Sequence, residues 1–150
     1  MAVFVNFLFP CALMSGSVVK CWGHNLDGEL GNGAITQFEP PVDVVGAADG
    51  FLEITVGGGF TCALTTAGGV KCWGSDNFGF MGSVPTTFTR TQPVDVVGLS
   101  GGIAGVEAGW DYVCTLSIDG TVKCGGSNSD GQLGDGTALD RPVPGVVISL

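Results

Sequence analysis

A thirteen-residue segment occurs three times in this chain at nearly constant spacing. The copies cover residues 11–23, 62–74 and 114–126, and their first cysteines are 51 and 52 residues apart. A period of this size indicates an array of supersecondary units, in which each unit buries its apolar surface against its neighbours. The repeat therefore predicts one domain made of units that cover roughly residues 1–46, 47–98 and 99–150.

Each copy has the pattern of a β-hairpin, with a short apolar run on either side of a turn. In the third copy, Asp119 and Gly120 stand where a type I turn followed by a left-handed residue requires them. A three-residue loop over 118–120 places Cys114 opposite Cys124 at a non-hydrogen-bonded pair, where Cα atoms approach to roughly 4.5 Å. That separation lies within the range of a disulfide.

The chain has six cysteines, and each copy holds two of them, ten positions apart. The predicted disulfides are Cys11–Cys21, Cys62–Cys72 and Cys114–Cys124. Such bonds indicate an oxidising compartment, which is extracellular or at the cell surface. The alternative is that the pairs are reduced thiols, which act as small buried apolar side chains. No metal site is predicted, because the cysteine spacing is not that of a zinc site and the chain has a single histidine.

Period-two alternation assigns each hairpin residue to one of the two faces of its sheet. For the second copy it predicts one face with Cys62, Leu64, Val70 and Cys72, and another with Ala63, Thr65, Lys71 and Trp73. Each unit also holds a Pro-led apolar run and one further strand, which makes about four short strands per unit. That is the content of a propeller blade, and 27 glycines suit the many tight turns it needs.

The net charge of −9 argues against nucleic acid as a partner, because such binding depends on Lys and Arg contacts to phosphate. It favours instead a protein partner with a basic face. No segment is long and apolar enough to span a bilayer, so no membrane insertion is expected. The apolar run over 1–14 is predicted to be a strand of the first unit, because Val3 and Val5 stand 51 positions before Ile54 and Val56.

No residues have the pattern of a catalytic nucleophile and its base, so no catalytic or cofactor-binding residue is predicted. His24 is assigned to a surface turn, since serines occupy its position in the other units. Asp27, Asp130 and Asp135 are assigned to turns that are rich in Asn, Asp and Gly. The alternative for these acids is a calcium loop, but they lack the alternating oxygen ligands and the closing Glu of an EF-hand.

Five side chains are candidates for contact with a partner, namely Trp110, Asp111, Tyr112, Phe78 and Phe80. The first three occupy a loop whose equivalent in the second unit is two glycines and a phenylalanine, so bulky groups replace glycine there. Exposed aromatic residues on the loops of a rigid scaffold are typical interface anchors. The alternative for each candidate is a packing role inside its blade.

One pattern recurs with substitutions in all three units: Gly-x-x-aromatic-x-Cys-x-Leu, then Gly-x-Val-Lys-Cys-Trp-Gly-x-Asn-x-x-Gly-x-Leu-Gly, although the first unit has Asn6-Phe7-Leu8 where glycines are usual. This pattern resembles the repeat of the regulator of chromosome condensation family, and it recurs in register over essentially the whole chain. The similarity is greatest to the cysteine-containing repeats of exported bacterial members. The resemblance implies an all-β, seven-bladed propeller, of which this chain holds about three blades. In the third unit Gly125 replaces the Trp of the pattern, so a blade-packing aromatic is missing.

Together these features predict a non-enzymatic scaffold, exported or at the cell surface, that binds a protein through its inter-strand loops. One alternative is a carbohydrate-binding or enzyme-associated module of a larger exported protein. Another, implied by the best-known activity of the family, is guanine nucleotide exchange on a small GTPase.

Three blades in a row are also expected to leave two terminal blade faces bare, because each blade buries its faces against neighbours. Residues 1–10 and 146–150 are both rich in apolar side chains. Further blades, or self-association with a second chain, are expected to cover these surfaces.

Overall fold

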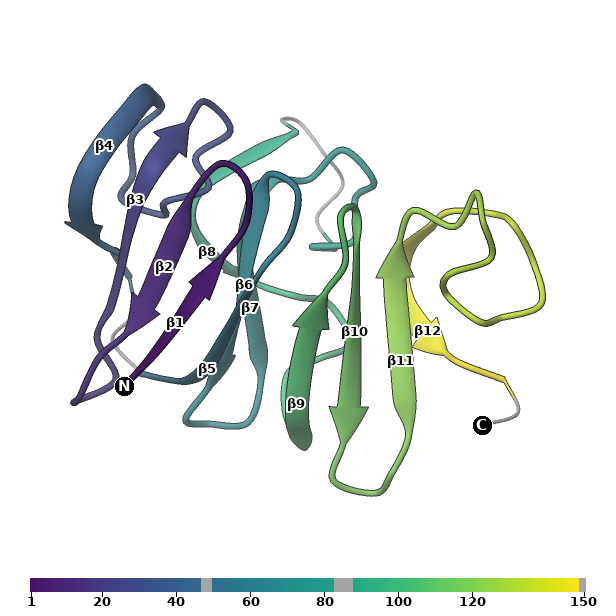
Figure 1. The fold of residues 1–150 in the computed structure, drawn as a ribbon. Coiled ribbons are helices and arrows are strands. Elements are labelled where there is room, and N and C mark those ends of the chain that lie inside the picture. The colour runs from purple at the N-terminus through teal and green to yellow at the C-terminus, as the bar shows by residue number, and fades with distance from the viewer. Residues whose placement is uncertain (47–49, 83–87, 149–150) are drawn as a thin grey trace.

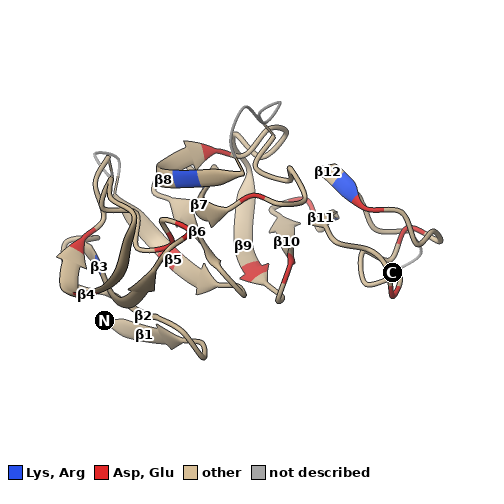
Figure 2. Cartoon of the chain, turned by 90° about the horizontal axis from the view of Figure 1, so that it is seen from above, with Lys and Arg blue, Asp and Glu red and all other residues tan. Residues whose placement is uncertain are grey.

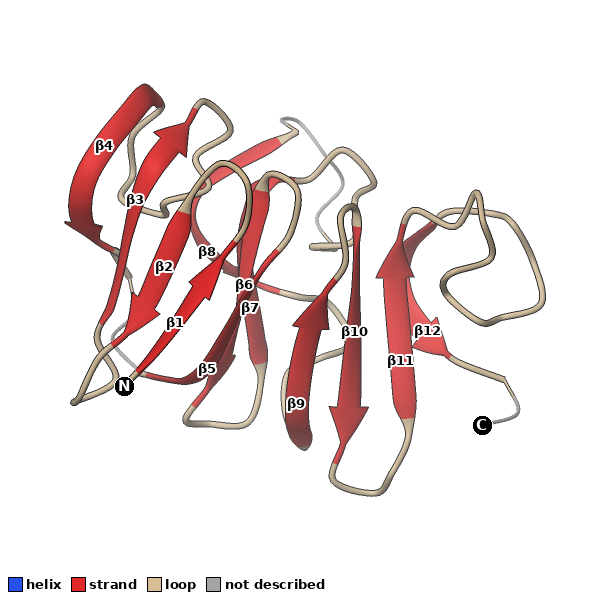
Figure 3. Cartoon of the chain, viewed as in Figure 1, coloured by secondary structure: helices blue, strands red, loops and turns tan. Residues whose placement is uncertain are grey.

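The computed structural model describes residues 1–46, 50–82 and 88–148. Within these ranges the chain forms three four-stranded antiparallel sheets that stand side by side (Figures 1 and 3). The predicted all-β fold with about three propeller blades is therefore confirmed. No described residues form a helix that could cross a lipid bilayer. The expected start of the second unit at residue 47 and the last two residues of the apolar run 146–150 lie outside the described ranges.

Each sheet, called a blade below, runs from an inner to an outer strand. The first blade consists of β1 (Ala2–Val5), β2 (Pro10–Leu13), β3 (Val19–Asn25) and β4 (Thr36–Asp43). The second consists of β5 (Phe51–Val56), β6 (Phe60–Thr65), β7 (Val70–Ser75) and β8 (Thr89–Asp95). The third consists of β9 (Ile103–Ala108), β10 (Tyr112–Ser117), β11 (Val122–Gly126) and β12 (Arg141–Val146). The inner strand β5 contacts both other inner strands, β1 and β9.

The repeated segment supplies the central hairpin of each blade. In the third blade the Ser117 N–H donates to the Thr121 carbonyl oxygen at 2.8 Å, which closes the predicted three-residue turn. The two cysteines of every copy lie directly opposite each other in the strand register. Their sulfur atoms are 2.09, 2.02 and 2.07 Å apart in the three blades, and their Cα atoms are 4.1 Å apart. The structure thus joins the cysteines in the predicted pairs.

The two faces of a blade differ, and successive blades pack one kind of face against the other. The face with the disulfide is called the cysteine face here, and the other the opposite face. The cysteine face of the second blade packs against the third blade, in a cluster that includes Cys62, Leu64, Val70, Cys72, Ile103, Val106 and Val113. Its opposite face packs against the cysteine face of the first blade, in a cluster that includes Ala63, Trp73, Cys11, Val19 and Cys21. The face assignment predicted for these residues is confirmed.

Trp73 is the largest fully buried side chain, and it lies between the first and second blades. A Cβ atom on Gly31 would lie only 2.6 Å from Nε1 of the Trp73 indole, so the ring rests on the Gly31 backbone. Gly31 has a φ of +68°, which only glycine adopts at little cost. In the third blade, where Gly125 takes the Trp position, Pro144 is buried 3.0 Å from the place of a Gly125 Cβ. Pro144 therefore occupies the space beside the missing aromatic.

A repeated turn follows each hairpin and is held by a buried Asn or Asp side chain. The side-chain oxygens of Asn25, Asp76 and Asn128 accept hydrogen bonds from backbone N–H groups five residues later, at 3.1, 3.1 and 2.9 Å. All three side chains are buried. This turn begins the longer loop between the third and outer strands of each blade, and it fixes where that loop leaves the sheet.

We expect the three cysteine pairs to be oxidised in protein purified without reductant. Peptide mapping under non-reducing conditions should recover the linked peptides of 11–21, 62–72 and 114–124. Reduction should lower the free energy of unfolding by about 2–3 kcal/mol per bond, because each bond closes a short loop in the unfolded chain. Six free thiols in protein that has passed through an oxidising secretory pathway would contradict this expectation.

Candidate protein-interaction site

Two sets of loops gather at one end of the blades, the upper end in Figure 1, which we call the loop end. One set joins each inner strand to the second strand, at 6–9, 57–59 and 109–111. The other set joins the third strand to the outer strand and is longer. The candidate site is built from both sets, because strands and disulfides hold their ends rigidly in place.

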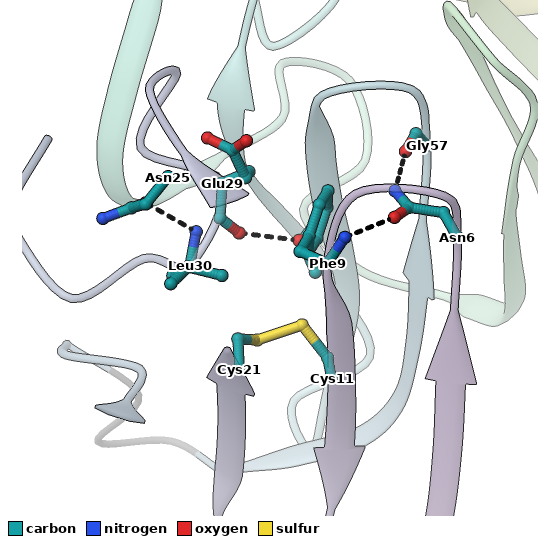
Figure 4. The surroundings of a disulfide bond; sticks show 9 residues. Asn6, Phe9, Cys11, Cys21, Asn25, Glu29, Leu30 and Gly57 are labelled. Atoms are coloured by element: carbon teal, nitrogen blue, oxygen red, sulfur yellow. Dashed lines mark hydrogen bonds between the residues drawn. A yellow bond between two sulfur atoms is a disulfide. The ribbon is translucent and has the colours of Figure 1, made fainter. Parts of the chain in front are cut away.

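The short loops are hydrogen-bonded to one another in a row across the blades. Asn6 Nδ2 donates to the Gly57 carbonyl oxygen at 2.6 Å, and the Gly58 N–H donates to the Trp110 carbonyl oxygen at 2.7 Å. The Asn6 side-chain oxygen also accepts from the Phe9 N–H at 2.7 Å, which shapes the first loop from within (Figure 4). Side chains carried by these loops are therefore held at defined positions relative to one another.

Trp110 presents an exposed indole in this row, with 62% of the residue accessible to solvent. A Cβ atom on Gly58 would lie 2.7 Å from the Trp110 carbonyl oxygen and 2.9 Å from the indole Nε1. The indole therefore lies across the Gly58 backbone, and the second loop needs glycine because the third loop carries tryptophan. Phe7, which holds the same repeat position in the first loop, is almost fully exposed. Sequence reasoning missed Phe7, although its alignment with Gly58 and Trp110 could have identified it.

The two neighbours of Trp110 have different surroundings. Asp111 is half-buried, and burial raises the pKa of its carboxyl group. The Asp111 carbonyl oxygen accepts a hydrogen bond from the Ser127 N–H at 2.9 Å, which ties the short loop to the long one. Tyr112 stands at the position of buried Phe60, and its ring packs over Gly109. The structure thus places Asp111 at the loop end and Tyr112 at the edge of the cysteine face.

The expectation that Phe80 contacts a partner is corrected by the structure. The Phe80 ring is fully buried in the core between the second and third blades, and it meets the Phe60 ring edge-on at a centroid distance of 4.9 Å. Phe78 is half-buried and packs against the same core. Both phenylalanines follow the buried turn at Asp76, which directs them toward the core. The glycines around them in the sequence do not reveal this direction.

The assignment of His24 to a surface turn is also corrected. His24 ends up half-buried on β3, where its Nδ1 contacts the carboxylate of fully buried Glu29. The same carboxylate accepts from the Asp27 N–H at 2.8 Å, and the Glu29 carbonyl oxygen accepts from the Thr61 hydroxyl of the second blade at 2.9 Å. Sequence reasoning missed Glu29, because the other two units carry Phe80 and Gln132 at its position.

Negative charge at the loop end is carried by Asp27, Asp111 and Asp130. In the described part of the chain none of these three forms an ion pair with Lys or Arg, whereas Asp135 pairs with Arg141 at 3.0 Å. Burial raises the pKa of Asp27, the nearby charge of Glu29 raises it further, and His24 acts in the opposite direction. Figure 2, which looks from above the loop end, shows acids spread over the three blades and few bases.

The described residues contain no group of three or more His, Cys, Asp or Glu side chains placed to hold a metal ion. The cysteines are joined in pairs. Two of the turn carboxylates accept hydrogen bonds from their own loops, Asp135 from the Thr137 N–H at 2.9 Å and Asp130 from the Ser129 hydroxyl at 3.2 Å. At the loop end the exposed aromatic side chains of Phe7 and Trp110 lie on loops that also carry carboxylates. Such a surface is suited to another macromolecule rather than to a small substrate.

Comparisons with known proteins identify the repeat. The family model of the regulator of chromosome condensation (RCC1) repeat matches residues 51–79. Among curated proteins, the ultraviolet-B receptor UVR8 of Arabidopsis thaliana is 33% identical over 137 residues, which are 89% of this chain and 31% of the receptor. The chain therefore spans about a third of the length of this relative.

Solved structures share the fold. Human WBSCR16 matches 99% of this chain with 37% of its own, at a TM-score of 0.86 and 21% identity. Prp20p of Saccharomyces cerevisiae matches 99% of this chain with 38% of its own, at a TM-score of 0.83 and 16% identity. These relatives come from a plant, a human and a yeast, so the expected membership among bacterial proteins remains a prediction. The expected total of seven blades also remains a prediction, because this chain covers only part of each relative.

We expect Gly58→Ala to displace the Trp110 loop, because the new methyl group would meet the Trp110 carbonyl oxygen at 2.7 Å. Overpacking of this kind costs about 1–3 kcal/mol of unfolding free energy. The Trp110 indole N–H signal in an NMR spectrum should shift, while that of Trp73 should not.

Gly101→Ala is the matched control, because a Cβ atom at Gly101 has no heavy atom within 4 Å. This variant should leave both the stability and the Trp110 signal close to those of the parent chain. Equal behaviour of the two variants would mean that Trp110 does not rest on Gly58.

Proposed function

Because this chain belongs to the regulator of chromosome condensation repeat family, we propose that it is a non-enzymatic scaffold that binds a protein partner through its loop end. The observation that carries the proposal is the exposed indole of Trp110, held across Gly58 by a backbone hydrogen bond of 2.7 Å. A rigid, exposed aromatic side chain loses little entropy when it enters a pocket of a partner, which is why Trp is enriched at binding hot spots.

Charge defines the kind of partner that the loop end fits. The exposed aromatics Phe7 and Trp110 lie among loops that carry Asp27, Asp111 and Asp130. A partner with an apolar pocket or cleft flanked by Lys and Arg would bury the indole and face these carboxylates. Complementary charge of this kind raises the association rate and selects the correct partner.

Relatives of the same fold support a role in protein binding. Yeast RCC1 (Prp20) was crystallised bound to Kap60, and binding properties to Gsp1p and histones are described for it. We carry over to this chain only the general mode, a propeller that binds proteins. The three cysteine pairs support the further proposal that the chain works outside the cytosol, in an oxidising compartment.

The test is affinity capture with the parent chain, with Trp110→Ala and with Phe38→Ala, followed by quantitative mass spectrometry. Phe38 is a matched control, since it is an equally exposed aromatic, at 70%, on the outer strand β4. Trp110→Ala should weaken binding of the true partner by about 2 kcal/mol, or roughly 30-fold, and leave the melting temperature nearly unchanged. Phe38→Ala should change neither.

Three results would contradict the proposal. If Trp110→Ala leaves every captured protein in place but lowers the melting temperature strongly, Trp110 is a packing residue. If a glycan array binds the chain while affinity capture recovers no protein, the alternative of a carbohydrate-binding module replaces the scaffold. Accelerated nucleotide release from a captured small GTPase would instead assign the chain to exchange factors.

A further inference from the structure

A lysine precedes the second cysteine of every hairpin, but its partner differs between the blades. In the first two blades this lysine lies opposite an Asp of the outer strand, and the two charged groups are 2.7 Å apart. The two pairs are Lys20–Asp43 and Lys71–Asp95. In the third blade the residue opposite Lys123 is Val146. Over the described ranges, no carboxylate forms an ion pair with Lys123.

The Lys123 side chain turns instead to the linker between the second and third blades. Its Nζ donates to the Gly98 carbonyl oxygen at 3.4 Å, which is long for a charged donor. An ammonium group has three N–H donors, and this weak bond uses one of them. The carbonyl group is neutral, so the charge of Lys123 is not balanced by an ion pair as it is in the other two blades.

Lys123 lines a hollow of about 420 Å³ between this linker and the turn of the third hairpin. The linker contributes Gly101 and Gly102, where an added Cβ atom would have no heavy atom within 4 Å. The hairpin contributes the hydroxyl-bearing side chains of Ser117 and Thr121. By alternation Ser117 and Lys123 belong to the opposite face of the third blade, which is turned toward the second blade. The volume lies within the range of pockets that bind small molecules.

Two more residues of the hollow limit the kind of ligand that it suits. Hydrogen bonds from Thr121 hold the pKa of Asp119 below its usual value, and the charge of Lys123 acts in the same direction. Asp119 is therefore ionised at neutral pH, where it repels a dianion more strongly than a monoanion and can accept hydrogen bonds from hydroxyl groups. Ile118, which is 77% exposed, adds apolar surface for C–H groups.

We propose that this hollow is a binding site for a small hydroxylated carboxylate, the chemical class of the sugar acids. The carboxylate of the ligand takes the place beside Lys123 that an Asp holds in the other two blades. Ser117, Thr121 and Asp119 form hydrogen bonds with its hydroxyl groups. The site lies at the hairpin turns, the lower end of the blades in Figure 1, and so it is independent of protein binding at the loop end.

The test is an NMR titration of the isotope-labelled chain with D-glucuronate as the probe. D-glucose is the matched compound, because it has the same ring but no carboxylate. With glucuronate the amide signals of Gly101, Gly102 and Ser117 should shift and saturate with a Kd of about 1 mM. Glucose should bind at least about tenfold more weakly, because it cannot form the charge-assisted bond to Lys123.

Two variants remove the unbalanced charge in different ways. Lys123→Gln deletes the ammonium group, whereas Val146→Asp supplies the carboxylate that the other blades have opposite their lysine. Each should weaken glucuronate binding at least about tenfold. Val146 is 51% exposed, so its replacement should leave the rest of the spectrum unchanged. Lys20→Gln is the matched control at the same repeat position, and it should bind glucuronate like the parent chain.

Any of three results would overturn the proposal. Equal affinity for glucose and glucuronate would show that the hollow recognises no carboxylate. Undiminished binding of glucuronate to a folded Val146→Asp chain would show that Lys123 is not the partner of the ligand. Shifts of similar size beside Lys20, Lys71 and Lys123 would show only a general attraction of anions to lysine.

Discussion

Face-to-face packing of unlike blade faces is the constraint on which the rest of this structure depends. A single four-stranded sheet of short strands cannot bury enough apolar surface to be stable alone. Here the disulfide, with Leu64 and Val70 beside it, forms one side of the contact, and the inner strand of the next blade forms the other. Because both sides are repeated, one solution of the packing problem serves along the whole chain.

The same packing explains where glycine is required. Gly31 and Gly58 belong to different kinds of loop, yet each is the seat of a tryptophan from the following blade, Trp73 in one case and Trp110 in the other. Trp73 is buried and stabilises the array, whereas Trp110 is left exposed at the loop end. The same contact between a tryptophan and a glycine therefore occurs twice. Where the tryptophan is buried it packs two blades together, and where it is exposed it is a candidate for binding a partner.

The strands could be predicted from the sequence because side-chain alternation and turn type depend on residues that are close together in the chain. Alternation over the hairpin of 62–72 placed Cys62 and Leu64 on one face and Trp73 on the other, and the turn at Asp119 and Gly120 set the pairing of the cysteines. These features need only the period of a strand and the chemistry of a turn. Three copies in register reinforced them.

The loops could not be read in the same way, because their side chains are placed by contacts with other blades. Phe80 was a candidate for partner contact, with packing as the alternative, and the turn at Asp76 folds it into the core. Glu29 is buried beside His24, in a pairing that neither of the other units contains. No periodicity predicts such residues, since each depends on a single substitution in one copy of the repeat.

The most direct test of this account is the free energy of unfolding of Trp73→Ala and Trp22→Ala, measured by urea denaturation of protein dilute enough to be monomeric. The two tryptophans hold the same repeat position, but only Trp73 has a neighbouring blade over it. The account predicts a loss of about 3–5 kcal/mol for Trp73→Ala, and a clearly smaller loss for Trp22→Ala. Equal losses for the two variants would contradict it, because stability would then come from within each blade rather than from the contact between blades.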